Sequence, residues 1–211
     1  MDDERPPRGR QAEARRNDLR VLEAARDVFA TLGADAPIAA VAARAGVGVG
    51  SLYRRYGSKD ELLQRLCVLA MEEATGAAEE GLAAADPWTG LTHYVRRCIA
   101  VRTGALAPLA GRIEVTPAME DLARRGGDLI DELVTRAHRS GDLRADATAL
   151  DVAYVIEQVG RRSPAPSPEE DVVRERLLTI ALDGLHAHAG CTPLPGAPPT
   201  RATYEARWAR R

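Results

Sequence analysis

One short stretch restricts the fold of this chain more than any other: residues 36–61, APIAAVAARAGVGVGSLYRRYGSKDE. Its first half carries apolar residues at helical spacing, namely Ile38, Val41, Ala42 and Ala45. This spacing places one apolar stripe along a helix of about two turns. Gly46 follows at once, and a glycine commonly ends a helix because it adopts positive φ without a Cβ clash. The stretch therefore predicts a short helix that stops in a glycine turn.

The second half of the stretch predicts another short helix, set at an angle to the first. Leu52 and Tyr56 are four residues apart and can face the same core, while Val47 can fill the angle between the two helices. The outward positions are small, hydroxyl-bearing or cationic: Val49, Gly50, Ser51, Tyr53, Arg54 and Arg55. Small residues let a helix backbone approach base edges, and hydroxyl and guanidinium groups can bond bases or phosphates. This pattern is typical of a helix-turn-helix that reads DNA.

The end of the stretch predicts the start of a third helix. Ser58 and Glu61 have capping-box spacing, so Lys59, the single lysine of the chain, falls near a helix N-terminus that favours phosphate. The predicted DNA-contacting residues are Val49, Gly50, Ser51, Tyr53, Arg54, Arg55 and Lys59. On spacing alone, an ordinary helical hairpin with solvated arginines explains the pattern equally well.

A family resemblance favours the DNA-binding interpretation. The positions that carry it are Leu22–Ala25, Phe29, Gly33, Val41–Ala42, Ala45–Val47, Gly50–Tyr53, Tyr56 and Ser58–Leu63. In this order they resemble the N-terminal domain of the TetR family of one-component regulators. The resemblance implies that a second domain binds an inducer and dimerises through its last two helices. It also implies operator contacts by Gly50, Ser51, Tyr53, Arg54, Arg55 and Lys59. Pro37 departs from the family, which often has a phosphate-binding threonine there.

Length and composition predict an all-α protein of two units. The 211 residues suit a small domain and a larger one, and 45% hydrophobic residues suffice for a buried core. No strand-like alternation is evident, and about nine helices are expected. The predicted divisions are a flexible arm over residues 1–15, a three-helix head over 16–60, a helical ligand-binding and dimerisation domain over 61–189, and a disordered tail over 190–211.

Charge is distributed unevenly along the chain. Residues 8–59 contain ten basic and five acidic side chains, whereas residues 60–190 contain fourteen basic and twenty-two acidic ones. The basic part coincides with the helix-turn-helix, as expected of a protein that approaches phosphate. Arginines 8, 10, 15 and 16 of the arm either add phosphate contacts or simply keep the arm solvated.

Several other classes of protein find little support. The first residues lack the apolar core of a signal peptide and no apolar run is long enough to span a bilayer, so a cytoplasmic protein without membrane contact is expected. The three cysteines include no CxxC pair, and His186 and His188, two positions apart, are expected on different sides of a helix. His93 and Cys98 lack a glycine elbow. We expect no enzyme, no metal and no cofactor.

The second domain is expected to be a small-molecule receptor. Polar or polarisable residues interrupt its apolar helix faces at Met71, Trp88, His93, Tyr94, Cys98, Arg102, Met119, Tyr154 and Gln158. Such a mixture suits a pocket, although the same residues at helical spacing often form plain core. The turn over residues 140–146 is similar to that of an actinobacterial subgroup of the family.

The predicted function is a repressor that an unknown small molecule releases from a near-palindromic operator. The alternatives are a helical binding module or enzyme that does not act on DNA, and a protein that coats DNA without a ligand. A homodimer is expected through the helices near residues 146–158 and 168–188, because the last helix has more apolar residues than one stripe needs.

Overall fold

The computed structural model describes residues 8–161 and 167–208, and within these ranges the chain is helical. Its helices are α1 (Arg8–Leu32), α2 (Ile38–Ala45), α3 (Val49–Tyr56), α4 (Lys59–Leu82), α5 (Pro87–Ala100), the 3₁₀ helix η1 (Thr103–Leu109), α6 (Pro117–Ser140), α7 (Ala149–Val159), α8 (Pro168–Leu185) and α9 (Arg201–Glu205). One isolated bridge pairs Leu143 with His186. The predicted all-α fold, a helix-turn-helix head with a larger helical domain, is confirmed.

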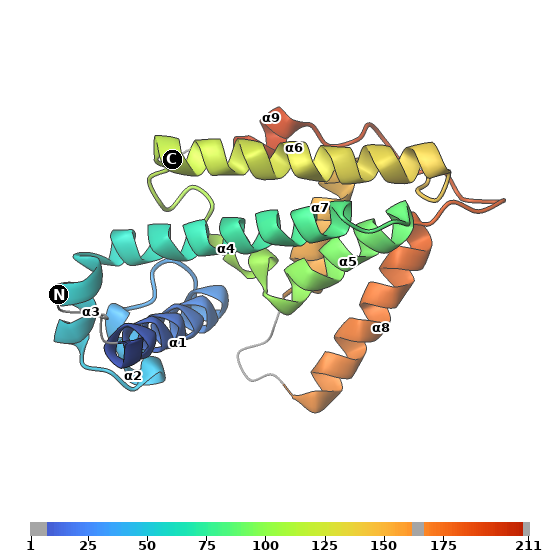
Figure 1. Ribbon diagram of the computed structural model, residues 1–211. Helices are drawn as coiled ribbons and strands as arrows, with labels where there is room; N and C mark the ends of the chain where they lie inside the picture. The colour runs from blue at the N-terminus through green and yellow to red at the C-terminus, as the bar shows by residue number, and fades with distance from the viewer. Residues whose placement is uncertain (1–7, 162–166, 209–211) are drawn as a thin grey trace, which may run out of the picture.

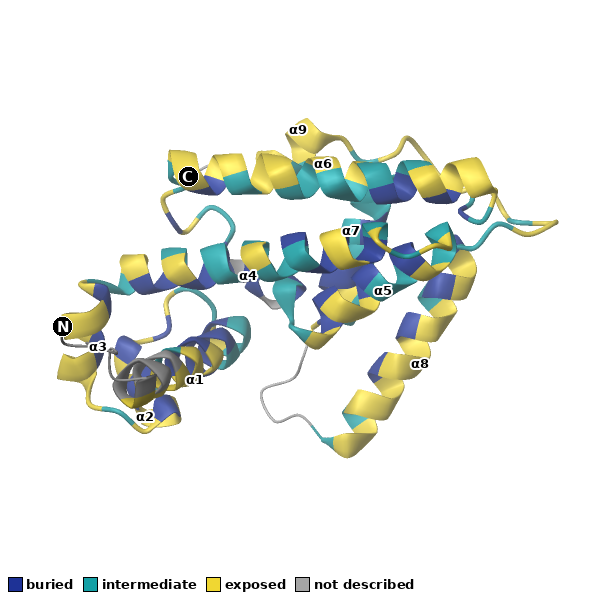
Figure 2. Ribbon diagram, in the orientation of Figure 1, coloured by how far each residue is buried: buried dark blue, intermediate teal, exposed yellow. Residues whose placement is uncertain are grey.

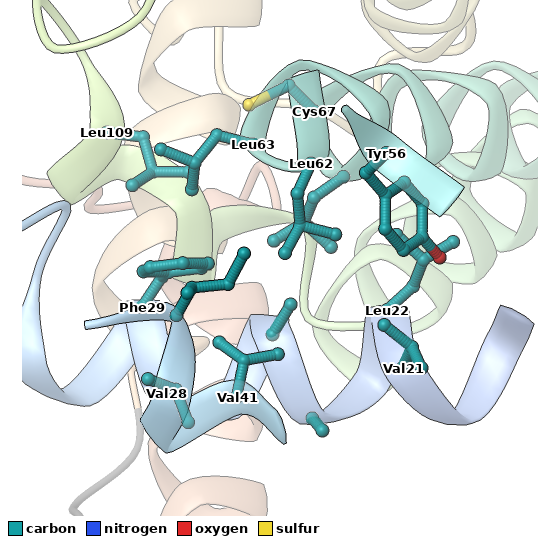
Figure 3. Packing of buried hydrophobic residues seen from close by; sticks show 14 of the residues in the cluster. Val21, Leu22, Val28, Phe29, Val41, Tyr56, Leu62, Leu63, Cys67 and Leu109 are labelled. Carbon is teal, nitrogen blue, oxygen red and sulfur yellow. The ribbon is translucent and has the colours of Figure 1, made fainter. Parts of the chain in front are cut away.

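The first three helices form a head around Phe29, which is completely buried. Figure 3 shows its ring among side chains from α1, α2 and α4, with Leu63 of α4 and Leu109 of η1 on one side of it. The same core continues into residues 106–119, where Leu109, Ile113 and Met119 are buried. The head is therefore not a separately packed unit, since part of the second domain completes its core.

Helix α4 connects the two parts of the molecule. It begins beside α3 and runs as one straight element between α5 and α6 (Figure 1). The hydroxyl of Ser58 accepts a hydrogen bond from the backbone N–H of Glu61 at 3.1 Å, which fixes the start of the helix. In a full capping box the Glu61 carboxylate would accept from the backbone N–H of Ser58. Here the carboxylate accepts from the Ser58 hydroxyl instead, at 3.3 Å.

Helices α4 and α5 cross at two glycines. A Cβ on Gly90 would lie 2.3 Å from the carbonyl oxygen of Gly81, and a Cβ on Gly81 would lie 2.6 Å from that of Gly90. Only residues without a side chain allow this approach. The second core lies around this crossing and includes Leu91, Tyr94, Val95, Cys98, Leu133 and Val152.

Two helix starts differ from the sequence-based prediction. Residues 8–15, expected in a flexible arm, belong to α1, while residues 1–7 of that arm lie outside the described ranges. The helix expected near residues 146–158 begins later, because Thr148 caps α7 in a capping box with Asp151. Asp146 pairs with Arg144 at 2.6 Å and accepts from the backbone N–H of Leu194, so its carboxylate is already engaged.

The C-terminal tail also differs from its expected disorder. Within residues 190–208 it forms α9, which lies over α6 (Figure 1). Arg201 pairs with Asp131 of α6 at 2.8 Å, and Trp208 packs against the core that contains the head. The proline- and glycine-rich composition conceals these anchors, because a few long side chains rather than a periodic apolar face hold the segment.

Candidate nucleic-acid interface

Helix α3 has one buried face and one solvent-facing face. Leu52 and Tyr56 are buried against the head. All six outward residues of the sequence-based prediction are exposed: Val49, Gly50, Ser51, Tyr53, Arg54 and Arg55. Gly46 adopts the left-handed conformation expected of it, with φ of 68°, and its N–H bonds the end of α2. The turn thus presents α3 as a protruding ridge at one end of the molecule (Figures 1 and 2).

A hydrogen-bond cluster fastens α3 to α1. The hydroxyl of Tyr56 donates to the Asp18 carboxylate, and Arg55 Nε lies 2.8 Å from the same Asp18 oxygen. Burial and then the bond to Asp18 raise the pKa of Tyr56, so its hydroxyl stays protonated and donating. Arg55 therefore has a partner within the head, whereas Arg54 forms no ion pair among the residues that the structure describes. The two adjacent arginines are not equivalent.

Lys59 lies at the first turn of α4 beside the end of α3. It is half-buried, and its ammonium nitrogen lies 5.8 Å from the centroid of the Phe29 ring. This distance is within cation–π range, so the ring supports the charge of Lys59 at the edge of the head. Pro37 occupies the cap position of α2 with extended backbone and provides no side-chain bond to the helix.

Polar contacts join the head to the second domain on the far side of α1. Arg26 is buried, lies 2.7 Å from Glu73 of α4 and also donates to the carbonyl of Val101. Asp27 binds Arg44 of α2 at 2.6 Å and also pairs with Arg102, which follows α5. Burial raises the pKa of Asp27, but hydrogen bonds from Arg44 and Arg102 outweigh it, and the pKa lies below its ordinary value. We call these contacts of Arg26 and Asp27 the α1 junction.

The predicted pocket residues do not gather around one space. Met71 and Met119 pack with the head core, and Tyr94 and Cys98 are buried in the second core. The remaining residues are at or near the surface: Trp88 against His186, His93 with Glu80, Arg102 at the α1 junction, Tyr154 against Tyr204, and Gln158 in solvent. A surface groove of about 250 Å³ lies between α5 and α8, and Trp88 is its one member from this set.

Two cysteines are poorly suited to nucleophilic chemistry. Burial raises the pKa of the Cys98 thiol to about 11 and that of Cys67 to about 12, so both stay protonated near neutral pH.

Among the described residues, no group of three or more histidine, cysteine or acidic side chains could hold a metal ion. No helix in the described ranges is both long and apolar enough to cross a membrane.

Sequence reasoning missed a buried acid on α7. Glu157 is only 6% exposed, and its hydrogen bonds come from Tyr204 and Arg207 of the tail. A signal was present, because Glu157 interrupts an apolar run and the tail contains aromatic residues next to arginines. The expectation of a disordered tail obscured it.

Comparison with known proteins identifies both parts of the chain. Residues 21–66 match the model of the bacterial regulatory proteins of the tetR family, and residues 86–187 match the C-terminal domain of SbtR-like transcriptional regulators. No curated protein sequence matches the chain significantly.

Solved structures agree with this assignment. A TetR transcriptional regulator from Streptomyces coelicolor is 26% identical, with a TM-score of 0.55 over 82% of this chain and 99% of its own. A second one from Mycobacterium vanbaalenii is 28% identical, with a TM-score of 0.56 over 84% of this chain and 99% of its own. A ketosteroid transcriptional regulator of Mycobacterium tuberculosis, 20% identical with a TM-score of 0.60 over 82% of this chain and 96% of its own, shares the fold.

The two model matches lie on either side of the α4–α5 connection and together span most of the chain. The first contains the helix-turn-helix with its exposed α3 face, and the second contains helices α5 to α8. Both describe transcriptional regulators, which excludes the alternative of a helical enzyme that does not act on DNA. The chain belongs to the TetR family and is a DNA-binding transcriptional regulator.

Proposed function

We propose that this regulator is a homodimeric repressor that binds a near-palindromic operator through α3 and leaves it when a small molecule binds the second domain. The observation that carries the proposal is the exposed face of α3, held rigidly on a head whose core the second domain completes. Because the second domain completes the core of the head, a rearrangement of the helices of that domain moves α3.

The residues on and beside the α3 face fall into two groups, those suited to contact bases and those suited to contact phosphates. Ser51 and Arg54 are exposed and carry donors that suit base edges in the major groove. Tyr53, whose side chain is also exposed, and Lys59, at the positive end of α4, suit phosphates. Arg55 is less suited than Arg54 to contact bases, because its guanidinium pairs with Asp18 and holds α3 against α1.

Helix α8 supports the dimer. One of its faces packs on the second core through Leu178, Leu182 and Leu185, as the blue stripe in Figure 2 shows. A second set of large apolar residues faces solvent, with exposed fractions between 51% and 63%: Val172, Val173, Leu177 and Ile180. Val173, Leu177, Ile180 and Gly184 follow helical spacing, and nothing lies within 4 Å of a Cβ on Gly184. A second copy of α8 fits this stripe, and the resulting two-fold axis requires a palindromic site.

The connection between the two parts supports release by a ligand. Helix α4 starts at Lys59, beside the end of α3, and ends within the second core, so a tilt of α4 alters the position of α3. The α1 junction adds a polar connection, because Arg26 and Asp27 bind residues of α4 and of the α5–η1 turn. A ligand that favours an α4 arrangement unsuited to the operator weakens DNA binding by some factor. Bound DNA must then weaken ligand binding by the same factor.

Selection of genomic fragments followed by footprinting tests this function. Purified protein is mixed with sheared DNA of the source organism, and the retained fragments are sequenced and footprinted. Two protected half-sites related by a two-fold axis are expected, about one helical turn or a multiple apart. Retention of fragments without a common sequence would refute an operator-specific repressor.

A further inference from the structure

A buried carboxylate on α7 is satisfied by the tail of the same chain. Glu157 lies on the side of α7 that the tail covers, and Arg207 donates to its two oxygens at 3.2 and 3.0 Å. The hydroxyl of Tyr204 donates to one of these oxygens at 3.0 Å. A bidentate pair between a guanidinium and a carboxylate is among the strongest polar contacts in proteins, and its geometry favours a planar cation.

Aromatic rings flank the cation on this carboxylate. The guanidinium carbon of Arg207 lies 5.5 Å from the ring centroid of Tyr154 and 5.1 Å from that of Tyr204. Both distances are within cation–π range, and the two rings meet edge to face at 5.8 Å. Ile156, the neighbour of Glu157 on α7, is buried in the second core. The cation thus lies at the edge of the second core.

The carboxylate needs a cation at this position. Gly104 of η1 packs so closely on α7 that a Cβ there would lie 2.8 Å from the Cα of Glu157. This contact closes one side of α7, and the hydrogen-bond partners of Glu157 are on the tail. A buried charge without a partner is costly, so loss of Arg207 leaves a site that favours another cation.

Apart from the contacts around Glu157 and Trp208, the tail has few anchors. Helix α9 has five residues, none of them buried, and an exposed proline- and glycine-rich segment connects it to α8. The Arg201–Asp131 pair is about half exposed on both sides, and such surface pairs contribute at most about 1 kcal/mol. The docking of residues 200–208 therefore depends largely on the contacts of Tyr204, Arg207 and Trp208.

We propose that Glu157 and Tyr154 form the recognition site for a small organic cation, a guanidinium, amidinium or ammonium group on an aromatic or apolar body, and that Arg207 is its internal occupant. The inference rests on the proposed function, since this cation is the effector of the repressor. Binding displaces the tail, and Trp208 then leaves the core cluster that contains the head. The site thereby connects ligand entry to the support of the head.

Calorimetry on the full chain tests the site with benzamidine, an aromatic amidinium, and benzamide, its neutral analogue. Removal of the internal occupant in Arg207→Ala should tighten benzamidine binding roughly 10–100-fold, if the tail is docked 90–99% of the time. Glu157→Gln should weaken it at least tenfold, and benzamide should not bind measurably. Arg201→Ala is the matched control, because this tail arginine does not contact Glu157, and loss of its surface pair should change the affinity by no more than about fivefold.

Hydrogen exchange of residues 200–208 provides a second readout that needs no DNA. Benzamidine should accelerate exchange of this segment in the unmodified protein, whereas benzamide should not. Equal benzamidine affinity for Arg207→Ala and the unmodified chain, or equal binding of benzamide, would overturn the inference. Operator binding separates the two proposals: a failed cation site with an intact operator complex refutes this inference alone, and cation binding without any operator complex refutes the proposed function.

Discussion

Replacement of Gly50 by alanine should stabilise the protein and weaken its complex with DNA. Gly50 lies in the first turn of α3 on the exposed face, and a Cβ built there has no neighbour within 4 Å. Alanine is therefore free of clashes in the isolated protein and gains roughly 0.5–1 kcal/mol of helix propensity. On DNA, the added methyl group occupies the space where the α3 backbone approaches base edges. We expect a loss of about 1–3 kcal/mol, a factor of roughly 5–150 in affinity.

The opposite signs of the two effects make the test specific. Urea denaturation gives the change in free energy of unfolding, and anisotropy of a labelled operator duplex gives the change in affinity. Gly76→Ala on α4 is the matched control, since its Cβ also meets no neighbour and it lies away from α3. The control should gain similar stability and keep its affinity. An unchanged affinity of the Gly50 variant would show that this part of α3 does not approach the duplex.

Three further substitutions test other parts of the account. Lys59→Ala should weaken binding to all sequences alike and lower the slope of log affinity against log salt by about 0.9; an unchanged slope would remove Lys59 from the phosphate contacts. Ile180→Arg should yield monomers in sedimentation analysis and at least tenfold weaker operator binding, and a persisting dimer would exclude the exposed α8 stripe as the interface. Gly90→Ala should lower the free energy of unfolding by roughly 1–3 kcal/mol despite better helix propensity, because its Cβ meets the Gly81 carbonyl; equal stability in urea would mean that the α4–α5 crossing relaxes freely.

The head was predictable from sequence because each of its helices carries local signals. Gly46 fixes the turn with a left-handed backbone, Ser58 caps α4, and Leu52 and Tyr56 occur at the helical spacing that buries them. These signals act within a few residues, so they can be recognised without knowledge of the tertiary structure. The exposed positions of α3 followed directly from the buried ones.

Long-range contacts could not be predicted in the same way. Asp146 has the form of a helix cap, yet Arg144 and the Leu194 backbone engage it. Arg55 looked equivalent to Arg54 until Asp18, thirty-seven positions earlier in the sequence, distinguished them. The pocket residues share apolar helix faces in the sequence, but the packing of α4 to α8 distributes them over two cores and the surface.

The tail illustrates the same limit most clearly. Its composition is typical of disorder, and no apolar periodicity indicates a docking face. Its position depends on a carboxylate at Glu157, fifty residues before Arg207, and on Asp131, seventy residues before Arg201. Such pairs become visible only when the fold brings the partners together.

Titration of a genome-selected operator with the unmodified protein and with Ser51→Ala tests the central claim most directly. The measurement compares affinity for the operator and for a scrambled duplex of equal length at two salt concentrations. The account predicts that the unmodified protein prefers the operator at least a thousandfold. Ser51→Ala should reduce that preference by roughly 1–3 kcal/mol while its salt slope stays unchanged. Equal affinity of the unmodified protein for both duplexes would contradict sequence-specific recognition by α3.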